Sequence, residues 1–258
     1  MRSVSKEELL KKIEEYKFKS HKPEEKLDMN RCRFENMDLS NTEMKNINFE
    51  WSDFMEVNLD GADFEGSDLS NTYMERLSMK GASFKNCLLH GANMRFTDIT
   101  GVNMEGADIF GANLEEAKIK DVKTNDKTKH FNMICPETGP IIGWKTCFNM
   151  RLVMLLIPEG ARITNSTLNT CRCDKAKVLK VTNPDESLKF DEARSFVDGD
   201  FVYKAGEMVY AKGFNPDRWR DSTGGIHFFL KKEEALGYLM SISEEQCETA
   251  TSWEKSGK

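Results

Sequence analysis

The sequence is short of the features that would place the chain in or across a membrane. Its longest apolar run is LVMLLI at 152–157, far below the ~20 residues that cross a bilayer. The first twenty residues are charged throughout and hold no apolar stretch of the kind a signal peptide needs. Seven cysteines, an odd number scattered along the chain, do not suggest a disulfide framework. We therefore expect reduced thiols, no membrane contact and a cytoplasmic location.

Motifs that carry chemistry are also missing. The sequence has no P-loop, no G-x-G-x-x-G, no nucleophile elbow and no H-E-x-x-H. The CRC stretch at 171–173 lacks C-x2-C spacing and a second close pair, which argues against a zinc site. His227 lies in an apolar run, as structural histidines do, and Asp217, Arg218 and Arg220 beside a turn fit an ion pair better than an anion site. We therefore predict no catalytic, cofactor-binding or metal-binding residue.

The chain has no excess of positive charge, and this excludes a protein whose whole surface grips DNA. Lys and Arg total 37 against 43 Asp and Glu, a net charge of −6. The acidity is concentrated in residues 28–121, which hold 9 basic and 18 acidic side chains, while the flanking parts nearly balance. With 39% hydrophobic residues, including 16 Phe, the chain can build a core, so it is neither disordered nor collagen-like.

What the sequence does contain is a period of five. Every fifth position from Met29 to Ile119 is large and apolar, nineteen in succession. Two positions before each centre stands a mostly smaller residue, one before is often Asp or Asn, and two after is often Gly or Asn. Helices repeat every 3.6 residues and strands every two, so neither explains a strict five. A flat-sided coil does, because each pentad can form one side with its centre inward and its Asn, Asp or Gly in a turn.

Segments such as GADFEGSDLSNTYM and GANMRFTDITGVNMEGADIFGANLEEAKI resemble the pentapeptide-repeat proteins, whose pattern is A(D/N)LXX. The resemblance implies a mainly β fold, a right-handed quadrilateral β-helix with four pentads per coil and about five coils in all. At about 4.8 Å per layer this solenoid would be ~23 Å long. Leu27, Met37, Ile47 and Leu77 are bulky where the family has a small residue, so we expect a wider or locally irregular coil at those corners.

We divide the chain into four parts. Residues 1–26 carry a capping box, SKEE, followed by apolar residues at helical spacing, which predicts an N-terminal capping helix over about 6–18 on the first coil. Residues 27–121 form the β-helix, 122–240 a small C-terminal α+β domain, and 241–258 a flexible tail. Within the third part, alternating apolar runs and turn signals predict a helix and six strands. The helix is predicted at 231–240 and the strands at 141–148, 152–157, 176–181, 201–204, 207–211 and 226–230.

The third part also resembles a known family. The stretches GWKTC, LLIPEGAR, CRCDKAKVLKV, VYKAGE and FNPDRWRDSTGGIHFFLKKEEAL are similar to a domain of unknown function, which often accompanies pentapeptide repeats in bacterial and large-virus proteins. That family assigns no activity. The resemblance therefore implies a domain boundary and no biochemical role.

The repeat register predicts which outward side chains share a face. When the pentads are sorted in fours, large apolar residues point outward on two adjacent faces and on neither of the others. They are Trp51, Leu88 and Phe110 on the first face and Met55, Tyr73 and Phe96 on the second. Such confinement indicates a covered surface. Either the C-terminal domain packs there within the chain, or a symmetric homodimer buries it.

Three functions stay open. The first is a non-enzymatic protein-binding or scaffold protein with a partner of unknown identity, no cofactor and no direct contact with nucleic acid. The second follows from the resemblance, because some pentapeptide-repeat proteins mimic B-form DNA and bind or protect DNA gyrase and topoisomerase IV. A duplex of ~23 Å would carry roughly −14, whereas residues 28–121 carry −9 spread over all four faces. The third is an uncharacterised enzyme activity in the C-terminal domain.

Overall fold

The fold is mainly β. The computed structural model describes residues 1–18, 22, 25–220 and 223–240, and these contain fifteen strands and two helices. The chain divides into two compact units, which are described separately below. The first unit is Met1–Asn132 with Trp219–Asp221, and the second is Met133–Arg218 with Ser222–Lys258. Neither described helix combines the length and the apolar character that a membrane span requires.

The first unit begins with β1 (Arg2–Ser3) and α1 (Lys6–Lys17). The Ser5 hydroxyl caps α1 by accepting a hydrogen bond from the N–H of Glu8 at 3.2 Å. Leu9 and Ile13 of α1 are buried in the same core as the first pentad centres. Strand β1 pairs in parallel with β3 (Cys32–Asp38), so both N-terminal elements are joined to the start of the repeats.

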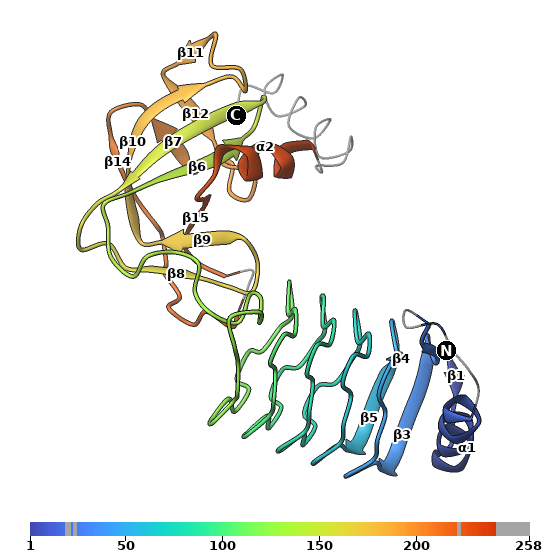
Figure 1. Cartoon of the computed structure of the whole chain (residues 1–258). Coiled ribbons are helices and arrows are strands. Elements are labelled where there is room, and N and C mark those ends of the chain that lie inside the picture. Colours follow the sequence, from blue (N-terminus) through green and yellow to red (C-terminus); the bar gives the residue numbers. More distant parts are fainter. Residues whose placement is uncertain (19–21, 23–24, 221–222, 241–258) are drawn as a thin grey trace. The chain divides into compact units, whose positions relative to one another are not determined.

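Residues twenty positions apart stack on one another along the repeats. Strand β3 pairs in parallel with β5 (Asp53–Asn58), and β2 (Leu27–Asp28) pairs with β4 (Ile47–Asn48). Isolated parallel bridges then continue at the same offset, and hydrogen bonds link the layers, as from Phe64 N to Ser83 O at 2.8 Å. Twenty residues equal four pentads, so each layer takes four pentads, and Figure 1 shows the layers following one another from blue to green.

The pentad centres form the core of this stack. Eighteen of the nineteen are buried, and the last, Ile119, is partly buried. Aromatic centres from successive layers stack face to face, with ring centroids 4.9 Å apart for Phe34 and Phe54 and 5.1 Å for Phe64 and Phe84. The large apolar period in the sequence is therefore the column of side chains that holds the layers together.

Turn chemistry explains the polar positions of the pentad. In eleven pentads the Asp or Asn before the centre accepts a hydrogen bond from the N–H two residues later, as Asp63 does from Glu65 at 3.0 Å. The residue two positions after the centre is the corner residue. All nineteen corner residues have φ between 50° and 72°. Gly and Asn, which tolerate this left-handed conformation, occupy twelve of the nineteen corners.

Two ends of the stack depart from the regular pattern. The bulky Met37 lies within the continuous strand β3 and pairs with Val57 of β5. On the same face of the later layers there are only isolated bridges, as between Asn58 and Ser78. At the other end, Asp108 bridges Lys129 rather than the residue twenty positions on. The last layer therefore includes residues beyond 121 and accommodates one additional residue.

The second unit is built on an eight-stranded sheet in the order β11-β10-β7-β6-β15-β9-β8, with β14 pairing β10. Every pair in it is antiparallel. Its strands are β6 (Ile141–Cys147), β7 (Arg151–Ile157), β8 (Ile163–Asn165), β9 (Thr170–Cys173), β10 (Lys175–Thr182), β11 (Lys189–Phe190), β14 (Met208–Tyr210) and β15 (Ile226–Phe229). A separate pair joins β12 (Glu192–Arg194) and β13 (Val202–Lys204). The helix α2 (Lys232–Met240) contacts β6 and β15 (Figure 1).

The second unit has more strand and less helix than an even α+β mixture, since α2 is the one helix among its described residues. Its core lies where apolar side chains of β7, β10 and β15 meet, for example Leu155, Val178 and Phe228. The tail predicted at 241–258 lies outside the described residues.

Candidate functional site

The repeat region, residues 27–121, exposes few large apolar side chains, and all of them come from the predicted set. All of 27–121 is described, and its exposed large apolar residues are Trp51, Met55, Tyr73, Leu88 and Phe110. Trp51 is the most accessible of them, at 50% exposed. The sixth predicted residue, Phe96, is partly buried. We call these six side chains the aromatic surface.

Two members of the aromatic surface sit in a strained backbone conformation. Trp51 and Phe96 are corner residues with φ of 60° and 57°. For residues with a Cβ this left-handed conformation costs roughly 1–2 kcal/mol. The exposed Trp51 makes one local hydrogen bond from its indole, to Glu50 Oε1 at 3.1 Å. A flat, apolar side chain thus stands at a position where the other layers favour Gly or Asn.

Phe96 is surrounded by cations. The guanidinium carbons of Arg76 and Arg95 lie 4.4 and 5.1 Å from its ring centroid, within cation–π range. Arg95 also pairs with Glu115 at 2.8 Å, and the other oxygen of that carboxylate pairs with Arg220 at 3.1 Å. This second face therefore combines aromatic rings and guanidinium groups, which protein interfaces favour, with a carboxylate that pairs with the arginines.

The first face carries a histidine–aspartate cluster beside Phe110. Asp108 Oδ1 lies 2.8 Å from His130 Nδ1, and its Oδ2 lies 3.4 Å from His90 Nε2 and 3.6 Å from Lys129 Nζ. Burial would raise the pKa of Asp108, but hydrogen bonds from His130 and His90 outweigh burial and hold that pKa below its ordinary value. The Phe110 ring packs edge-on against both imidazoles. Even so, the described residues include no group of His, Cys, Asp or Glu side chains placed to hold a metal ion.

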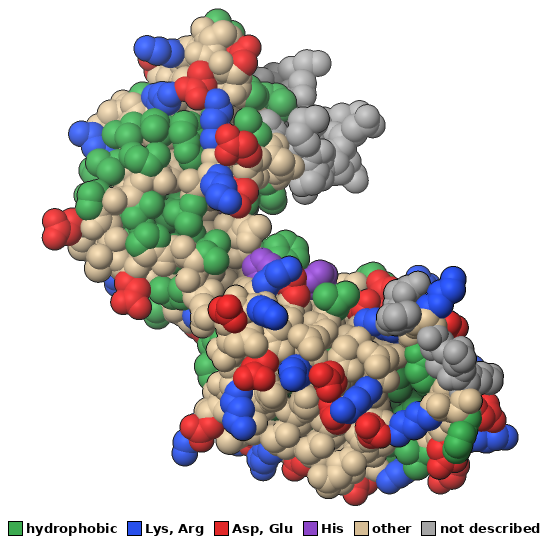
Figure 2. All heavy atoms as spheres, viewed as in Figure 1, with side chains coloured by type: hydrophobic (Ala, Val, Ile, Leu, Met, Phe, Trp, Pro, Cys, Tyr) green, Lys and Arg blue, Asp and Glu red, His purple; other side chains and the backbone are tan. Residues whose placement is uncertain are grey.

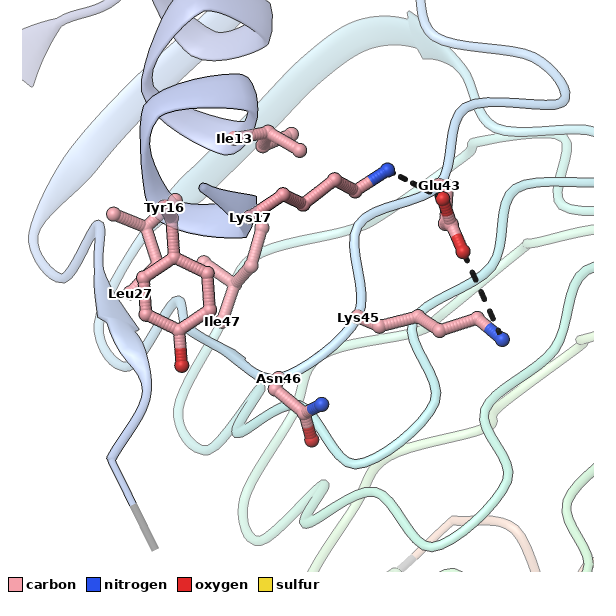
Figure 3. A pocket seen from close by; sticks show the side chains of 8 residues that line it. All are labelled: Ile13, Tyr16, Lys17, Leu27, Glu43, Lys45, Asn46 and Ile47. Atoms are coloured by element: carbon pink, nitrogen blue, oxygen red, sulfur yellow. Dashed lines mark hydrogen bonds and ion pairs between the residues drawn. The ribbon is translucent and has the colours of Figure 1, made fainter. Parts of the chain in front are cut away.

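A pocket of about 220 Å³ lies between α1 and the first layers, and Figure 3 shows the side chains that line it. Apolar side chains of α1 and of the first pentads line one side, and Lys17, Glu43 and Lys45 line the other. Lys17 pairs with Glu43, and Lys45 pairs with Glu43 and also with Asp63 and Glu65, so each charged group of this pocket already has a partner. The pocket therefore offers no charge left over to recognise a ligand.

The residues of the second unit that we considered for chemistry lie near one another around β9, but the described residues include no metal-binding group there. Cys171 and Cys173 are buried on one side of β9. The Arg172 guanidinium is also buried and donates a hydrogen bond to the Asp217 carbonyl at 2.7 Å. His227 lies on β15 opposite Arg172 in the strand register. Sequence reasoning missed the contact of Cys135 with Asn165, because thirty residues separate them and no periodic signal connects them.

Comparisons with known proteins match the repeats and the C-terminal part of the chain to two different families. A family model described as pentapeptide repeats matches residues 32–71 and 78–115, and a family of unknown function, DUF5758, matches 131–235. Among solved structures the chain is similar to HetL from the cyanobacterium Nostoc sp. strain PCC 7120, a protein involved in heterocyst differentiation regulation. The identity is 20%, the match covers 37% of this chain and 46% of HetL, and the TM-score is 0.35.

It is also similar to Rfr23 from the cyanobacterium Cyanothece 51142, with 18% identity, coverage of 40% of this chain and 86% of Rfr23, and a TM-score of 0.27. Full-length QnrB1, a plasmid-mediated fluoroquinolone resistance protein, is 17% identical, with 38% and 68% coverage and a TM-score of 0.15. No curated protein matches the chain. Residues 32–71 and 78–115 are therefore pentapeptide repeats, and residues 131–235 are a DUF5758 domain.

Proposed function

We propose that residues 27–121 form a right-handed quadrilateral β-helix of about five coils, capped by the helix within residues 1–26, that serves as a non-enzymatic protein-binding scaffold. Two observations support this architecture: the parallel bridges at an offset of twenty, and the positive φ of the corner residue in every pentad. The burial of Leu9 and Ile13 in the core of the repeats supports a capping role for α1. We assign the C-terminal domain, 122–240, no catalytic role.

The observation that carries the binding role is the strained, exposed corner at Trp51. Backbone strain persists where something else requires the residue, and it is found more often at functional sites than elsewhere. Trp and Arg are also the residues that most often dominate the energy of protein interfaces. The aromatic surface offers both, with Trp51 on one face and Phe96 between Arg76 and Arg95 on the next. Its partner is a protein that covers these rings.

Mimicry of DNA receives less support from the charges. Lys45 pairs with Asp63 at 3.0 Å and with Glu65 at 3.2 Å, so a cation interrupts the acidic face. Asp98 likewise lies between Lys118 and Lys80. Figure 2 shows basic and acidic side chains interspersed on the visible face of the repeats, unlike the uniform charge of a phosphate backbone.

The test compares Trp51→Asn with Glu116→Asn in the full chain. Both corners have positive φ, so Asn should relieve strain in both and raise the free energy of unfolding by about 1 kcal/mol. Trp51→Asn alone removes an apolar contact. In pull-downs from the native host, we expect it to lose at least roughly tenfold in captured partner while Glu116→Asn retains the partner.

Three outcomes distinguish a protein partner at this surface from a homodimer and from DNA mimicry. A partner retained by Trp51→Asn would overturn the proposed surface. A wild-type dimer in sedimentation velocity that Trp51→Asn converts to monomer would identify a second copy of the chain as the partner. Inhibition of gyrase supercoiling by the wild type, unchanged in Trp51→Asn, would instead favour DNA mimicry.

A further inference from the structure

The second face of the repeats carries strained corner residues along one edge. One pentad from each layer forms this face, and we number the layers one to five by their centres on it: Phe34, Phe54, Met74, Met94 and Leu114. In layers two to four its corner residues are Glu56, Arg76 and Phe96, with φ of 53°, 63° and 57°. The next two corner columns hold only Gly or Asn in these layers. Backbone strain is found more often at functional sites than elsewhere, so this edge is a candidate for contact with a partner.

Two carboxylates on the second face have no cation of their own. Glu35 belongs to layer one and Glu56 to layer two, and both side chains are exposed. Within the described part of the chain, neither side chain takes part in an ion pair or a hydrogen bond. Because the stacked layers hold both residues in a fixed register, these carboxylates can bind cations of a partner at fixed spacing.

Two arginines occupy the equivalent positions in the next two layers. Glu35 and Arg95 each follow a pentad centre directly, whereas Glu56 and Arg76 are both corner residues. Arg76 pairs with the adjacent Glu75 at 3.3 Å, yet its side chain is 68% exposed and accessible to a second carboxylate. The Arg95 side chain is 35% exposed. At these positions the charge is therefore negative in layers one and two and positive in layers three and four.

We propose that the second face binds the same face of a second copy of the chain, with the two stacks antiparallel and a twofold axis between layers two and three. This inference rests on the binding role proposed above and names the partner. The axis sets layer one against layer four, and layer two against layer three, of the other copy. Glu56 then lies opposite Arg76 and Glu35 opposite Arg95, so the symmetry forms four ion pairs across the interface.

The apolar side chains of the second face lie close to this axis. Met55 in layer two is 37% exposed and Tyr73 in layer three is 40% exposed. Each would lie one layer, about 4.8 Å along the stack, from its own symmetry mate. Trp51, at the opposite edge of layer two, would meet Asn71 of the other copy. The interface would thus have an apolar centre and charged pairs at its edge, which is the usual anatomy of a protein interface.

Other arrangements of the two faces are less favourable. An axis through layer three places Arg76 against its own symmetry mate, and an axis through layer two does the same for Glu56. An axis between layers three and four places Glu56 against Glu116. Each of these registers sets like charges opposite one another, which costs affinity. With the stacks parallel, Glu56 would meet Trp51 of the other copy and remain unpaired.

The test measures association of the full chain by sedimentation equilibrium. Four layers span about 19 Å, so the interface belongs to the small class that buries less than ~1,200 Å² and needs protein concentrations up to ~300 µM. We expect the wild type to dimerise and the dimer to weaken as salt is added. Glu56→Arg alone and Arg76→Glu alone should each raise the dissociation constant at least roughly tenfold, because like charges then face each other twice.

An equimolar mixture of these two variants tests the register itself. One copy then carries two arginines at the paired corners and the other two glutamates, so a heterodimer should form with about the wild-type affinity. A variant that had merely unfolded could not be rescued in this way. Layer five lies outside the register, so Glu116→Arg, a matched reversal of a corner charge, should dimerise as the wild type does.

The outcomes separate this inference from the binding role on which it rests. A mixture that stays monomeric, or a loss of the dimer in Glu116→Arg, overturns the proposed register. A wild type that is monomeric at ~300 µM, but whose captured host partner is lost in Trp51→Asn, overturns the second copy as partner and leaves the binding role intact. A monomeric wild type that also captures no partner overturns both.

Discussion

The repeat region and the second unit satisfy their buried polar groups by different rules. In the repeats, the Ser52 hydroxyl accepts from Cys32 N and donates to Met29 O, and Ser67 repeats this pattern fifteen residues later. In the second unit, the buried Arg172 donates a hydrogen bond to the Asp217 carbonyl, forty-five positions away. Because the contacts of the repeats are periodic, each repeat position has equivalent positions in other layers. Each buried polar group of the sheet, in contrast, has its own set of partners.

The substitution expected to destabilise the repeat region most is Phe64→Ala. Phe64 is fully buried, stacks on Phe84 with the rings only 6° from parallel, and meets the edges of two further rings. Deleting it leaves a cavity between layers and should lower the free energy of unfolding by ~3–5 kcal/mol, measured by urea denaturation. Phe18→Ala, at a 91% exposed site, should change it by less than ~0.5 kcal/mol. A loss at Phe64 no larger than at Phe18 would mean that the layers collapse around the gap.

Ser67→Ala tests the hydroxyl ladder. The Ser67 Oγ accepts from Ile47 N at 2.9 Å and donates to Met44 O at 2.8 Å, and the hydroxyl is fully buried. Alanine leaves both backbone groups unsatisfied, so we expect a loss of ~1–3 kcal/mol in the free energy of unfolding. Cys87, the equivalent position one layer later, gives the control. Cys87→Ser retains a donor to Phe64 O and should stay within ~0.5 kcal/mol of the wild type.

Much of the repeat region could be predicted from sequence because its determinants recur at fixed offsets. The period of five identified the buried centres and the outward aromatic residues without any long-range information. It also placed Trp51 and Phe96 at a corner usually held by Gly or Asn. The sequence therefore already contained the signal for this strain.

The second unit was predictable only in part. Its longer strands β6 and β7 lie close to their predicted positions, because a continuous apolar run marks β7 and turn signals precede β6 and follow β7. The short strands β8 and β9 were missed, since the ITN and TCRC stretches lack apolar alternation and are stabilised by pairing with each other and with the distant β15. The Cys135–Asn165 contact depends on the same non-local pairing, so no local pattern could reveal it.

Substitutions at two corner glycines measure the free-energy cost of placing a side chain in the left-handed backbone conformation. Gly81 and Gly91 both have φ of 65°, but a Cβ at Gly81 would meet nothing within 4 Å, whereas at Gly91 it would lie 2.7 Å from Asn71 Oδ1. Alanine at Gly81 should therefore cost only the left-handed strain, about 1 kcal/mol in thermal unfolding. Gly91→Ala should cost a few tenths of a kcal/mol more, because the Asn71 amide must also rotate. Equal losses would show that Asn71 moves freely, and no loss at Gly81 would contradict the strain assigned to Trp51.

The smallest expected effect is the pH dependence of one surface carboxylate. Asp98 accepts a hydrogen bond from the Thr100 hydroxyl at 2.7 Å and from the Thr100 N–H, and it lies 3.4 Å from Lys118 and 3.7 Å from Lys80. The Thr100 hydroxyl first, and then the lysines, hold the pKa of Asp98 below its ordinary value. A lowered folded pKa stabilises the native state above the unfolded pKa of ~3.9, and this stabilisation disappears as the pH falls through the folded pKa.

Asp98→Asn should therefore melt below the wild type at neutral pH, and the difference should shrink as the pH falls below ~4. Asparagine keeps an acceptor for the Thr100 N–H, so the variant removes mainly the charge. Melting temperatures of both proteins across this range measure the effect. A difference that stays constant down to ~pH 2.5 would mean that the carboxylate acts through its shape and hydrogen bonds alone. The charge pairs of the repeats would then contribute regular packing rather than electrostatic stability, and the repeat region would differ from the second unit only in its buried polar groups.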